Sequence, residues 1–336
     1  MHSKAEKKYF YKSKTNNKKS IVRKKKKKHN SNKENRFKKL FCFFIMIKFI
    51  FLFFLLSFHL FCNNYQKKIL DNFYKKRLAY IKMRGRRYNE SNLITFVDKI
   101  NWLAIHDVTK LKINCADKIL IHEYSKRVLK KDICNKILKI YDNPEQINID
   151  ELPEKFVLKA NHGSNYNIIV TNRTGFDINK AKKSLSKWLE IDYGNIHKEM
   201  HYSFIKRKVF AEEYIGKDLN NYKFFCYNGI PRYVYIHQEI DNKKYRTFFD
   251  MNWNKLDFIC DFPNHPTAIN LKPKYFELMK EYAKKLSHPF IFVRVDFYEF
   301  NDKIRLGEMT FTPMNGDYQC QDRKHNIELG KYIKIY

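Results

Sequence analysis

The sequence lacks the cysteine patterns that identify disulfide-stabilised folds and zinc clusters. Its 336 residues include seven cysteines, but no C-x-x-C pair. Two cysteines fall in an apolar run near the N-terminus and the other five are scattered: Cys42, Cys62, Cys115, Cys134, Cys226, Cys260 and Cys320. An odd, unpatterned set of this kind predicts mostly free thiols.

Several catalytic motifs are absent as well. The sequence has no Gly-Lys-Ser/Thr phosphate loop, no Asp-x-Asp pair for the metal of a sugar nucleotide, no zinc-finger spacing and no RNA-recognition signature. His197 and His201 form the sequence HKEMH, which lacks the Glu that follows the first His in zinc metalloproteases. No Ser/His/Asp or Cys nucleophile is convincingly placed, so covalent catalysis by the protein is not indicated.

Acidic residues are scarce: there are 35 Asp+Glu against 67 Lys+Arg, a formal net charge of +32. Residues 1–40 hold 17 Lys+Arg and 2 Asp+Glu, so a net +15 lies in this tail and +17 is spread over the other 296 residues. A basic tail suits an anionic membrane surface as well as nucleic acid. Because the excess outside the tail is weak, we expect no nucleic-acid partner.

The N-terminal region predicts a tail followed by a membrane span. Residues 1–39 are rich in Lys, Asn and Ser without an apolar period, which predicts a disordered basic tail. The 23 residues 40–62 are mainly apolar, with Lys48 and His59 as the ionisable exceptions, and predict one transmembrane helix, with a buried core helix as the alternative. Ten Lys or Arg at positions 23–39, against six in the twenty residues after the span, favour a type II topology with a cytosolic N-terminus. Because the flank after the span is also basic, the side of the membrane on which the C-terminal domain lies stays open.

Residues 63–91 predict a charged helical stem, and residues 92–336 have the composition of a folded domain. Apolar spacing predicts helices within 92–142, followed by a polar break at 143–153. Further helices are expected at 181–190 and 275–286, and strands at 156–160, 168–171, 209–215, 223–227 and 233–238. Mixed elements of this kind predict an α+β fold in one or two lobes.

The stretch RVDFYEFNDKIRLGEMTFTP predicts a β-hairpin near the C-terminus. Residues 292–300 and 304–311 have aromatic and β-branched residues between charges, and residues 301–303 have turn-forming side chains. A three-residue loop places residues whose numbers sum to 604 opposite each other. A two-residue loop would instead put the carboxylates of Asp296 and Glu308 on opposite faces of the hairpin, because side chains alternate along a strand.

In that register, Asp296 lies opposite Glu308 and Arg294 lies opposite Thr310, all on one face. Like charges at this separation are destabilising unless something compensates them. Mg²⁺ would compensate, because it binds oxygen ligands and is often shared between carboxylates and substrate phosphates. A solvated surface hairpin is the alternative interpretation.

Two other stretches could contribute to a nucleotide site. LPEKFVLKANHGSNYNIIV, residues 152–170, predicts two strands around a small polar loop, with Lys159 at the end of the first strand. Backbone N–H groups of such a loop can bind phosphate. VFAEEYIGKD, residues 209–218, predicts an apolar strand that ends in two carboxylates, whose exposed backbone could pair with an adenine edge. Each stretch alone is also consistent with ordinary surface structure.

Taken in order, these stretches resemble the TupA-like (teichuronopeptide biosynthesis) type of ATP-grasp protein. The resemblance covers about residues 92–330, and its collinear blocks are TFVDKINWL (95–103), CADK (115–118), LPEKFVLKANHGS (152–164), AEEYIG (211–216), NYKFFCYNGIPRYV (221–234) and the hairpin. It implies an ATP-grasp fold that holds ATP between two α+β lobes, with ATP and Mg²⁺ as cofactors. It further implies that a carboxylate is activated as an acyl phosphate and attacked by an amine, in the modification of cell-surface polysaccharide or glycan.

The resemblance also implies roles for individual residues. ATP would be bound by Lys118, Lys159, His162, Gly163, Ser164, Glu212, Glu213 and Ile215. Mg²⁺ would be bound by Asp296 and Glu308, catalysis would involve Arg294 and Lys159, and the acceptor would contact Thr310, Thr312 and Gly316.

The sequence departs from the family pattern at three positions. Thr310 stands where many ATP-grasp ligases have a metal-binding Asn, Asn165 where the phosphate loop more often has Gly, and Met314 where a small residue is usual near the acceptor. The anchor-stem-domain order also suits a type II membrane glycosyltransferase of polysaccharide biosynthesis, although no Asp-x-Asp pair is present. A membrane-tethered module that keeps the fold without activity is a further alternative.

Overall fold

The computed structural model describes residues 68–216 and 219–335. The predicted tail, residues 1–39, and the predicted transmembrane helix, residues 40–62, lie outside the described residues. Within the described part, no helix is long and apolar enough to cross a bilayer. The chain divides into two units, Met1–Asp71 and Asn72–Tyr336. Only the helical residues 68–71 of the first unit are described, so the fold below is that of the second.

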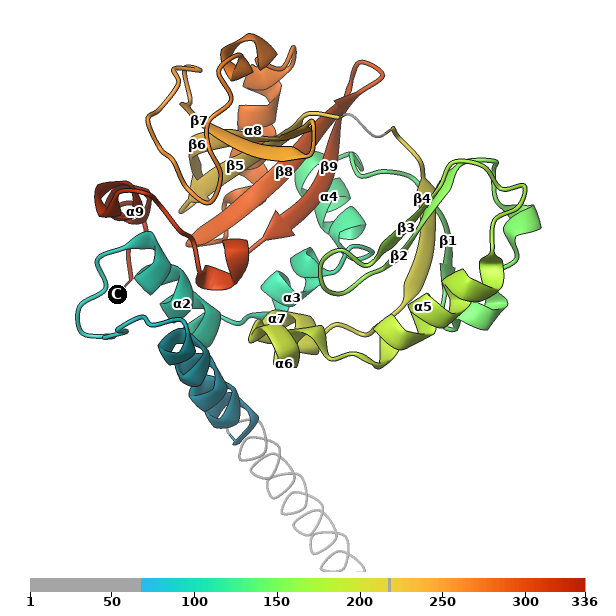
Figure 1. Ribbon diagram of the computed structural model, residues 1–336, viewed down its shortest axis with the longest axis horizontal. Helices are drawn as coiled ribbons and strands as arrows, with labels where there is room; N and C mark the ends of the chain where they lie inside the picture. Colours follow the sequence, from blue (N-terminus) through green and yellow to red (C-terminus); the bar gives the residue numbers. More distant parts are fainter. Residues whose placement is uncertain (1–67, 217–218, 336) are drawn as a thin grey trace, which may run out of the picture. The chain divides into compact units, whose positions relative to one another are not determined.

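The second unit begins with the helical residues 72–83, which lie within the predicted stem. Three more helices follow: α2 (Phe96–His106), α3 (Lys110–Ala116) and α4 (Ile121–Leu129). α2 begins with a capping box in which Thr95 and Asp98 each accept a hydrogen bond from the other's backbone N–H. The helices expected within 92–142 are therefore present, but this region ends in a strand that the sequence did not predict (Figure 1).

A four-stranded antiparallel sheet, the small sheet, contains that extra strand (Figure 1). Its order is β1 (Ile137–Tyr141), β4 (Val209–Glu213), β2 (Phe156–Ala160) and β3 (Asn167–Val170). Helix α5 (Ile178–Glu190) packs through Ala181 and Leu185 onto one face of this sheet. Two short helices, α6 (Tyr193–His197) and α7 (Met200–Ser203), connect α5 to β4. Alternation along β2 leaves Val157 and Lys159 for the face that α5 does not cover.

A five-stranded antiparallel sheet, the large sheet, forms the rest of the unit. Its order is β7 (Lys243–Asp250), β6 (Ile230–Ile240), β5 (Asn221–Tyr227), β8 (Phe292–Phe300) and β9 (Lys303–Thr310). Helix α8 (Phe276–Ser287) packs against one face, over Phe224, Val295 and Phe297. The other face is apolar only near α2 and α9 (Arg323–Gly330) and carries charged residues elsewhere. We call this second surface the site face.

The turn between β8 and β9 differs from the expected three-residue loop. It consists of Asn301 and Asp302, both in the left-handed region with φ of 49° and 54°, which is the backbone of a two-residue hairpin turn. The register then shifts between Asp296 and Phe297, because Gly307 is an extra residue on β9. This β-bulge restores the predicted pairing of Asp296 with Glu308. A side chain on Gly307 would collide with the ring of Tyr298.

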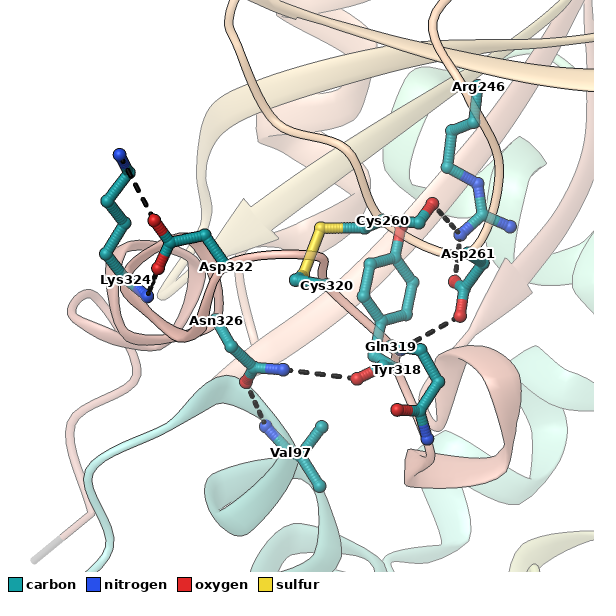
Figure 2. Close-up of a disulfide and its surroundings, with 10 residues drawn as sticks. All are labelled: Val97, Arg246, Cys260, Asp261, Tyr318, Gln319, Cys320, Asp322, Lys324 and Asn326. Atoms are coloured by element: carbon teal, nitrogen blue, oxygen red, sulfur yellow. Dashed lines mark hydrogen bonds and ion pairs between the residues drawn. A yellow bond between two sulfur atoms is a disulfide. The ribbon is translucent and has the colours of Figure 1, made fainter.

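The expectation of mostly free thiols needs correction at one pair. Cys260 and Cys320 form a disulfide, whereas Cys115, Cys134 and Cys226 are free and buried. The disulfide joins the segment after β7 to the segment before α9, as Figure 2 shows. Sixty positions separate the two cysteines, so no local spacing could have predicted the pair.

Candidate active site

Both sheets contribute side chains to one cavity of about 690 Å³. The small sheet provides Val157, Lys159, Glu212 and Glu213, and the site face of the large sheet provides Lys223, Tyr235, Arg246, Arg294 and Glu308. Lys118, from the segment after α3, completes the lining on the small-sheet side. The cavity is therefore rich in cations, which suits a polyanionic ligand.

Arg294 is the centre of the hydrogen-bond network on the site face. Its Nε and Nη2 donate to the two carboxylate oxygens of Asp296, both at 2.7 Å. Its Nη2 also donates to Glu308 Oε1 at 2.7 Å and to the Thr310 hydroxyl at 3.0 Å. Lys223 forms a second ion pair with Asp296. The predicted face shared by Arg294, Asp296, Glu308 and Thr310 is thus observed, with charge compensation from within the protein.

The cations determine the protonation of Glu308. Burial alone would raise the pKa of this carboxyl, but Lys223, Arg294 and Lys118 together hold its pKa well below the usual range. Burial would likewise lower the pKa of Arg294, and Asp296 and Tyr235 instead raise it well above the ordinary value. Glu308 is therefore an anion and Arg294 a cation throughout the physiological pH range.

The oxygen atoms at this end of the cavity fit Mg²⁺ unequally. The side chain of Glu308 is 36% exposed and lines the cavity, with the Thr310 hydroxyl donating to it at 3.2 Å. Asp296 is fully buried, and both of its oxygens are bonded to Arg294 or Lys223. Carboxylate oxygens are what Mg²⁺ prefers, so Glu308 is a fitting ligand as it stands. Asp296 would bind the ion only if Lys223 released its oxygen.

On the small-sheet side, two lysines approach the cavity. Lys159 on β2 forms an ion pair with Glu212 on β4. The ammonium group of Lys118 donates to the backbone carbonyl of Gly163, which ties the segment after α3 to the predicted phosphate loop. Burial and the proximity of Lys159 lower the pKa of Lys118, although Glu308 opposes this effect. The charge of Lys159 thus lies close enough to Lys118 to lower the pKa of Lys118.

The loop of residues 161–165 faces the cavity only in part. Gly163 has φ of 80°, and a side chain there would collide with the ring of Tyr193. Ser164 lines the cavity. His162 does not: it is fully buried, its Nε2 lies 3.0 Å from the carbonyl of Trp188, and burial lowers its pKa to about 4. His162 therefore holds the loop in place rather than facing a ligand.

The residues predicted to bind adenine and ribose, Glu212, Glu213 and Ile215, all line the cavity, but the two carboxylates already have partners within the protein. Ile215 lines the cavity just after β4. Glu213 lines it too, but its carboxylate accepts a hydrogen bond from the backbone of Lys136 and pairs with Arg305 at 3.3 Å. Glu212, in contrast, is 7% exposed and is engaged by Lys159.

The predicted acceptor residues are placed differently from expectation. The hydroxyl of Thr312 is buried and donates to Glu199, whose own pKa is raised by burial to about 7. Gly316 packs against Arg77 and Asn101, away from the cavity lining. From the same segment it is Met314 that lines the cavity. The 312–316 segment therefore reaches the cavity through Met314, a residue at which the sequence departs from the family pattern.

Comparison with known proteins identifies the family. The sequence model described as TupA-like ATPgrasp matches residues 98–334. The chain belongs to the TupA-like ATP-grasp family. This agrees with the resemblance carried by the sequence blocks and assigns the two-sheet α/β domain to the ATP-grasp fold. No curated protein matches the sequence.

The chain also has distant similarity to several solved structures. D-alanine–D-alanine ligase from Bacillus anthracis, complexed with ATP, is 14% identical, with 59% of this chain and 53% of that chain covered and a TM-score of 0.35. N5-carboxyaminoimidazole synthase from Aspergillus clavatus, in complex with ADP, is 13% identical, with 62% and 46% covered and a TM-score of 0.35. The ATP-grasp ligase PsnB is 8% identical, with 58% and 51% covered and a TM-score of 0.35. The chain thus spans about half the length of these structures.

Several cavity residues of this TupA-like domain were missed by sequence reasoning. Lys223, Tyr235, His237, Arg246 and Tyr298 all line the cavity. The signal that could have found Lys223 is its position as the one charged residue in the apolar strand NYKFFCY. Tyr298 alternates with Arg294 and Asp296 along β8, so the predicted hairpin face could have indicated it. The remaining three needed the strand register, because β7 was not predicted and the site face of β6 could not be told from its opposite face.

Proposed function

We propose that this chain is an ATP- and Mg²⁺-dependent ligase that activates a carboxylate as an acyl phosphate for attack by an amine. The observation that carries the proposal is the single cavity in which Lys118 and Lys159 from one side meet Arg294 and Glu308 from the other. A transferring phosphoryl group needs cations from the protein and a carboxylate-bound metal ion around it. The cavity contains groups of both kinds, and family membership agrees with this assignment.

In this proposal, ATP lies along the small-sheet side of the cavity. Lys118 and Lys159 bind its phosphates, and Ser164 presents the loop backbone to them. Glu212 and Glu213 lie at the end of β4, close in the chain to Ile215, which also lines the cavity. In this proposal the backbone at Ile215 pairs with the adenine edge. Lys159 must exchange part of its ion pair with Glu212 for phosphate, which leaves that carboxylate available for a ribose hydroxyl.

Magnesium, when bound, supplies charge neutralisation and alignment of the phosphate oxygens. Glu308 would hold it, with the Thr310 hydroxyl beside it and Asp296 as a second carboxylate once Lys223 has moved. Arg294 keeps both carboxylates in place through its hydrogen bonds. Its remaining donors then face the phosphoryl group, so that its charge stabilises the transfer.

The proposed reaction has two displacement steps. A carboxylate oxygen of the substrate attacks the γ-phosphorus of ATP, the bond to the bridging oxygen breaks, and ADP leaves. The amine nitrogen then attacks the carbonyl carbon of the acyl phosphate, phosphate leaves, and the amine gives up a proton. The protein contributes position and charge in both steps, which is consistent with the absence of a recognisable nucleophile.

We propose further that the acceptor is a cell-surface polysaccharide or glycan, and that residues 40–62 anchor the protein in a membrane in type II orientation. The Cys260–Cys320 disulfide supports a location outside the cytosol, because disulfides persist in oxidising compartments. Both candidate N-glycosylation sites, Asn89 and Asn172, are exposed. A mobility shift on glycosidase treatment would support this orientation, and unglycosylated sites in a protein expressed through the secretory pathway would contradict it.

The decisive experiment measures release of ADP by the full-length protein from ATP with Mg²⁺, pooled amino acids and uronic acid glycans. We expect release that needs Mg²⁺, a carboxylate and an amine together, and that is lost in Glu308→Gln. Thermal stabilisation by Mg-ATP and by UDP-sugars, measured in parallel, tests the glycosyltransferase alternative. Stabilisation by a UDP-sugar alone would refute the ligase assignment.

A further inference from the structure

Arg246 is a buried cation of the cavity to which the proposed phosphoryl transfer gives no role. It lies on β7, the strand farthest from β9, and is only 3% exposed. Its register partner is His237, which in turn pairs with Asn221, and Asn221 pairs with Tyr298. Arg246 therefore ends a row of cavity-lining residues that crosses the site face.

One side of the Arg246 guanidinium is held firmly by the protein. Its Nη1 pairs with the carboxylate of Asp261 and donates to the carbonyl of Cys260 at 3.4 Å. Gln319 fixes Asp261 beside the disulfide (Figure 2): the Gln319 carbonyl accepts from the Asp261 backbone N–H at 2.6 Å, and the Gln319 backbone N–H donates to the Asp261 carboxylate at 2.9 Å. Three aromatic rings surround the guanidinium, with centroids 4.8, 5.0 and 5.1 Å from its Cζ: Tyr235, Tyr318 and Phe262. The orientation of the side chain is thus set before any ligand arrives.

The other side of the guanidinium has no oxygen partner. Within the described residues, Nε of Arg246 is buried without a hydrogen-bond acceptor, and Nη2 contacts only the thioether sulfur of Met314 at 3.8 Å. This Nε and Nη2 edge is the one with which Arg294 binds both oxygens of Asp296. A guanidinium edge matches the geometry of a carboxylate, whereas a thioether is a weak acceptor. A carboxylate is therefore the better partner for this edge.

Met314 lies against Nη2 of this edge and is itself exposed. Met314 is 44% exposed and lines the cavity. It lies in a 3₁₀ segment, Pro313–Gly316, where Met314 and Asn315 both have left-handed backbone angles, with φ of 51° and 55°. Displacement of the Met314 side chain into the cavity would free Nη2 of Arg246 without any change in the sheet.

We propose that the Nε and Nη2 edge of Arg246 binds a substrate carboxylate other than the one that is activated, and that Met314 covers this edge until the carboxylate displaces it. The inference rests on the proposed function only in taking this cavity as the active site. Tyr235 separates the two arginines, contacting Arg294 at 3.4 Å through its hydroxyl and Arg246 through its ring. One substrate carboxylate can thus react near Arg294 while another is held by Arg246.

The carboxylate could belong to a uronate of the glycan or to the amine-bearing substrate, and the test distinguishes these sources. The full-length protein is labelled with [methyl-¹³C]methionine, and the Met314 resonance is assigned by its loss in Met314→Gln. D-glucuronate is titrated against D-glucose, and a pool of α-amino acids against the same amino acids as amides. We expect one of the two carboxylates, and not its neutral counterpart, to shift the Met314 resonance saturably. A response to D-glucuronate identifies the glycan as the source of the carboxylate, and a response to the amino acids identifies the amine-bearing substrate.

Arg246→Gln should abolish the response. An equal response to the neutral compound, a response that persists in Arg246→Gln, or no response to either carboxylate would overturn the inference. In case Arg246→Gln folds poorly, Met314→Glu offers a second test, because its own carboxylate should occupy the edge. Calorimetric titration should then show carboxylate binding at least about tenfold weaker in Met314→Glu than in Met314→Gln, the loss expected when a charged hydrogen-bonding pair is blocked.

Binding of Mg-ATP is measured in the same proteins by thermal denaturation. We expect it to be retained in Met314→Gln and Met314→Glu, because Met314 does not belong to the proposed nucleotide side of the cavity. If wild-type protein responds to the carboxylate but not to Mg-ATP, the ligase proposal fails and the Arg246 site remains. The reverse result removes the Arg246 site alone.

Discussion

Asp296 lies directly opposite Glu308 across β8 and β9, yet Asp296 is fully buried whereas the Glu308 side chain is 36% exposed. The inner carboxylate is engaged by Arg294 and Lys223, and the outer one faces the cavity. The two carboxylates therefore have different roles. Asp296 holds the cations of the site face in place, and Glu308 is the group that a ligand meets first.

Replacing each carboxylate by its amide should distinguish the structural role of Asp296 from the ligand-binding role of Glu308. Asp296→Asn leaves the nearly buried Lys223 without its carboxylate partner and leaves Arg294 paired with Glu308 alone. We therefore expect the free energy of unfolding to fall by about 3–5 kcal/mol, together with loss of ATP turnover. Glu308→Gln should also abolish turnover, but with a stability loss of about 1 kcal/mol, because water reaches this position. Urea denaturation and ADP release measure the two effects. Equal destabilisation by both variants would contradict the assigned difference.

The Lys159–Glu212 pair allows a double-mutant test of nucleotide binding. Lys159→Met leaves Glu212 nearly buried and unpaired, so we expect a loss of about 2 kcal/mol in the free energy of unfolding, between the values for exposed and buried pairs. Lys159→Met with Glu212→Gln should recover most of that stability. Thermal stabilisation by Mg-ATP should be absent in both proteins, because the phosphate-binding charge is gone. Recovery of Mg-ATP binding in the double variant would show that Lys159 does not contact phosphate.

The pairing of Asp296 with Glu308 could be predicted from the sequence, but for an incomplete reason. A three-residue loop was expected, and the protein instead uses a two-residue turn at Asn301 and Asp302 plus a bulge at Gly307. Each change alone would move Glu308 to the other face, and together they cancel. The NDK turn sequence contains turn residues at all three positions, so only the cross-strand contacts decide the loop length.

Other features depended on long-range contacts that local patterns do not encode. The strands β2, β4, β5 and β6 and the helices α5 and α8 were predicted close to their observed bounds, because each has a clear apolar period. Strand β1 was missed because its sequence ILKIY continues a helical pattern. Arg246 and the disulfide were missed because their partners lie 15 and 60 positions away. Thr312 was assigned to the acceptor because nothing in the sequence indicated the buried Glu199.

Glu199 should make stability depend on pH. Burial raises its pKa from 4.5 to about 7, although the Thr312 hydrogen bond and Arg77 oppose the shift and Glu308 adds to it. Between these two values the unfolded chain releases a proton that the folded protein keeps, so the free energy of unfolding falls as pH rises. The expected total is on the order of 3 kcal/mol and is complete above pH 7.

Comparison of wild type with Glu199→Gln from pH 5 to 8 measures this effect. The amide cannot ionise, so the variant should gain stability relative to wild type as pH rises, while all other titrating groups cancel in the difference. Glu308 has its pKa shifted downwards, so its contribution is lost only as pH falls below about 4.5 and stays outside this window. Parallel stability curves for the two proteins would contradict a neutral Glu199.

Removal of the Cys260–Cys320 disulfide should weaken both the fold and the Arg246 site. The bond closes a loop with a sequence separation of 60, for which the chain-entropy relation gives a stabilisation of about 4 kcal/mol. The cysteines adjoin Asp261 and Gln319, so Cys260→Ala with Cys320→Ala should also loosen the ion pair that orients Arg246. We expect the double variant to unfold at lower urea concentration and to bind the carboxylate more weakly, with Mg-ATP binding unchanged.

Reduction of the wild-type protein should reproduce this behaviour and leave the double variant unaffected. Peptide mapping without reductant must show a linked pair containing Cys260 and Cys320, and separate peptides in fully active protein would rule out a structural role for the bond.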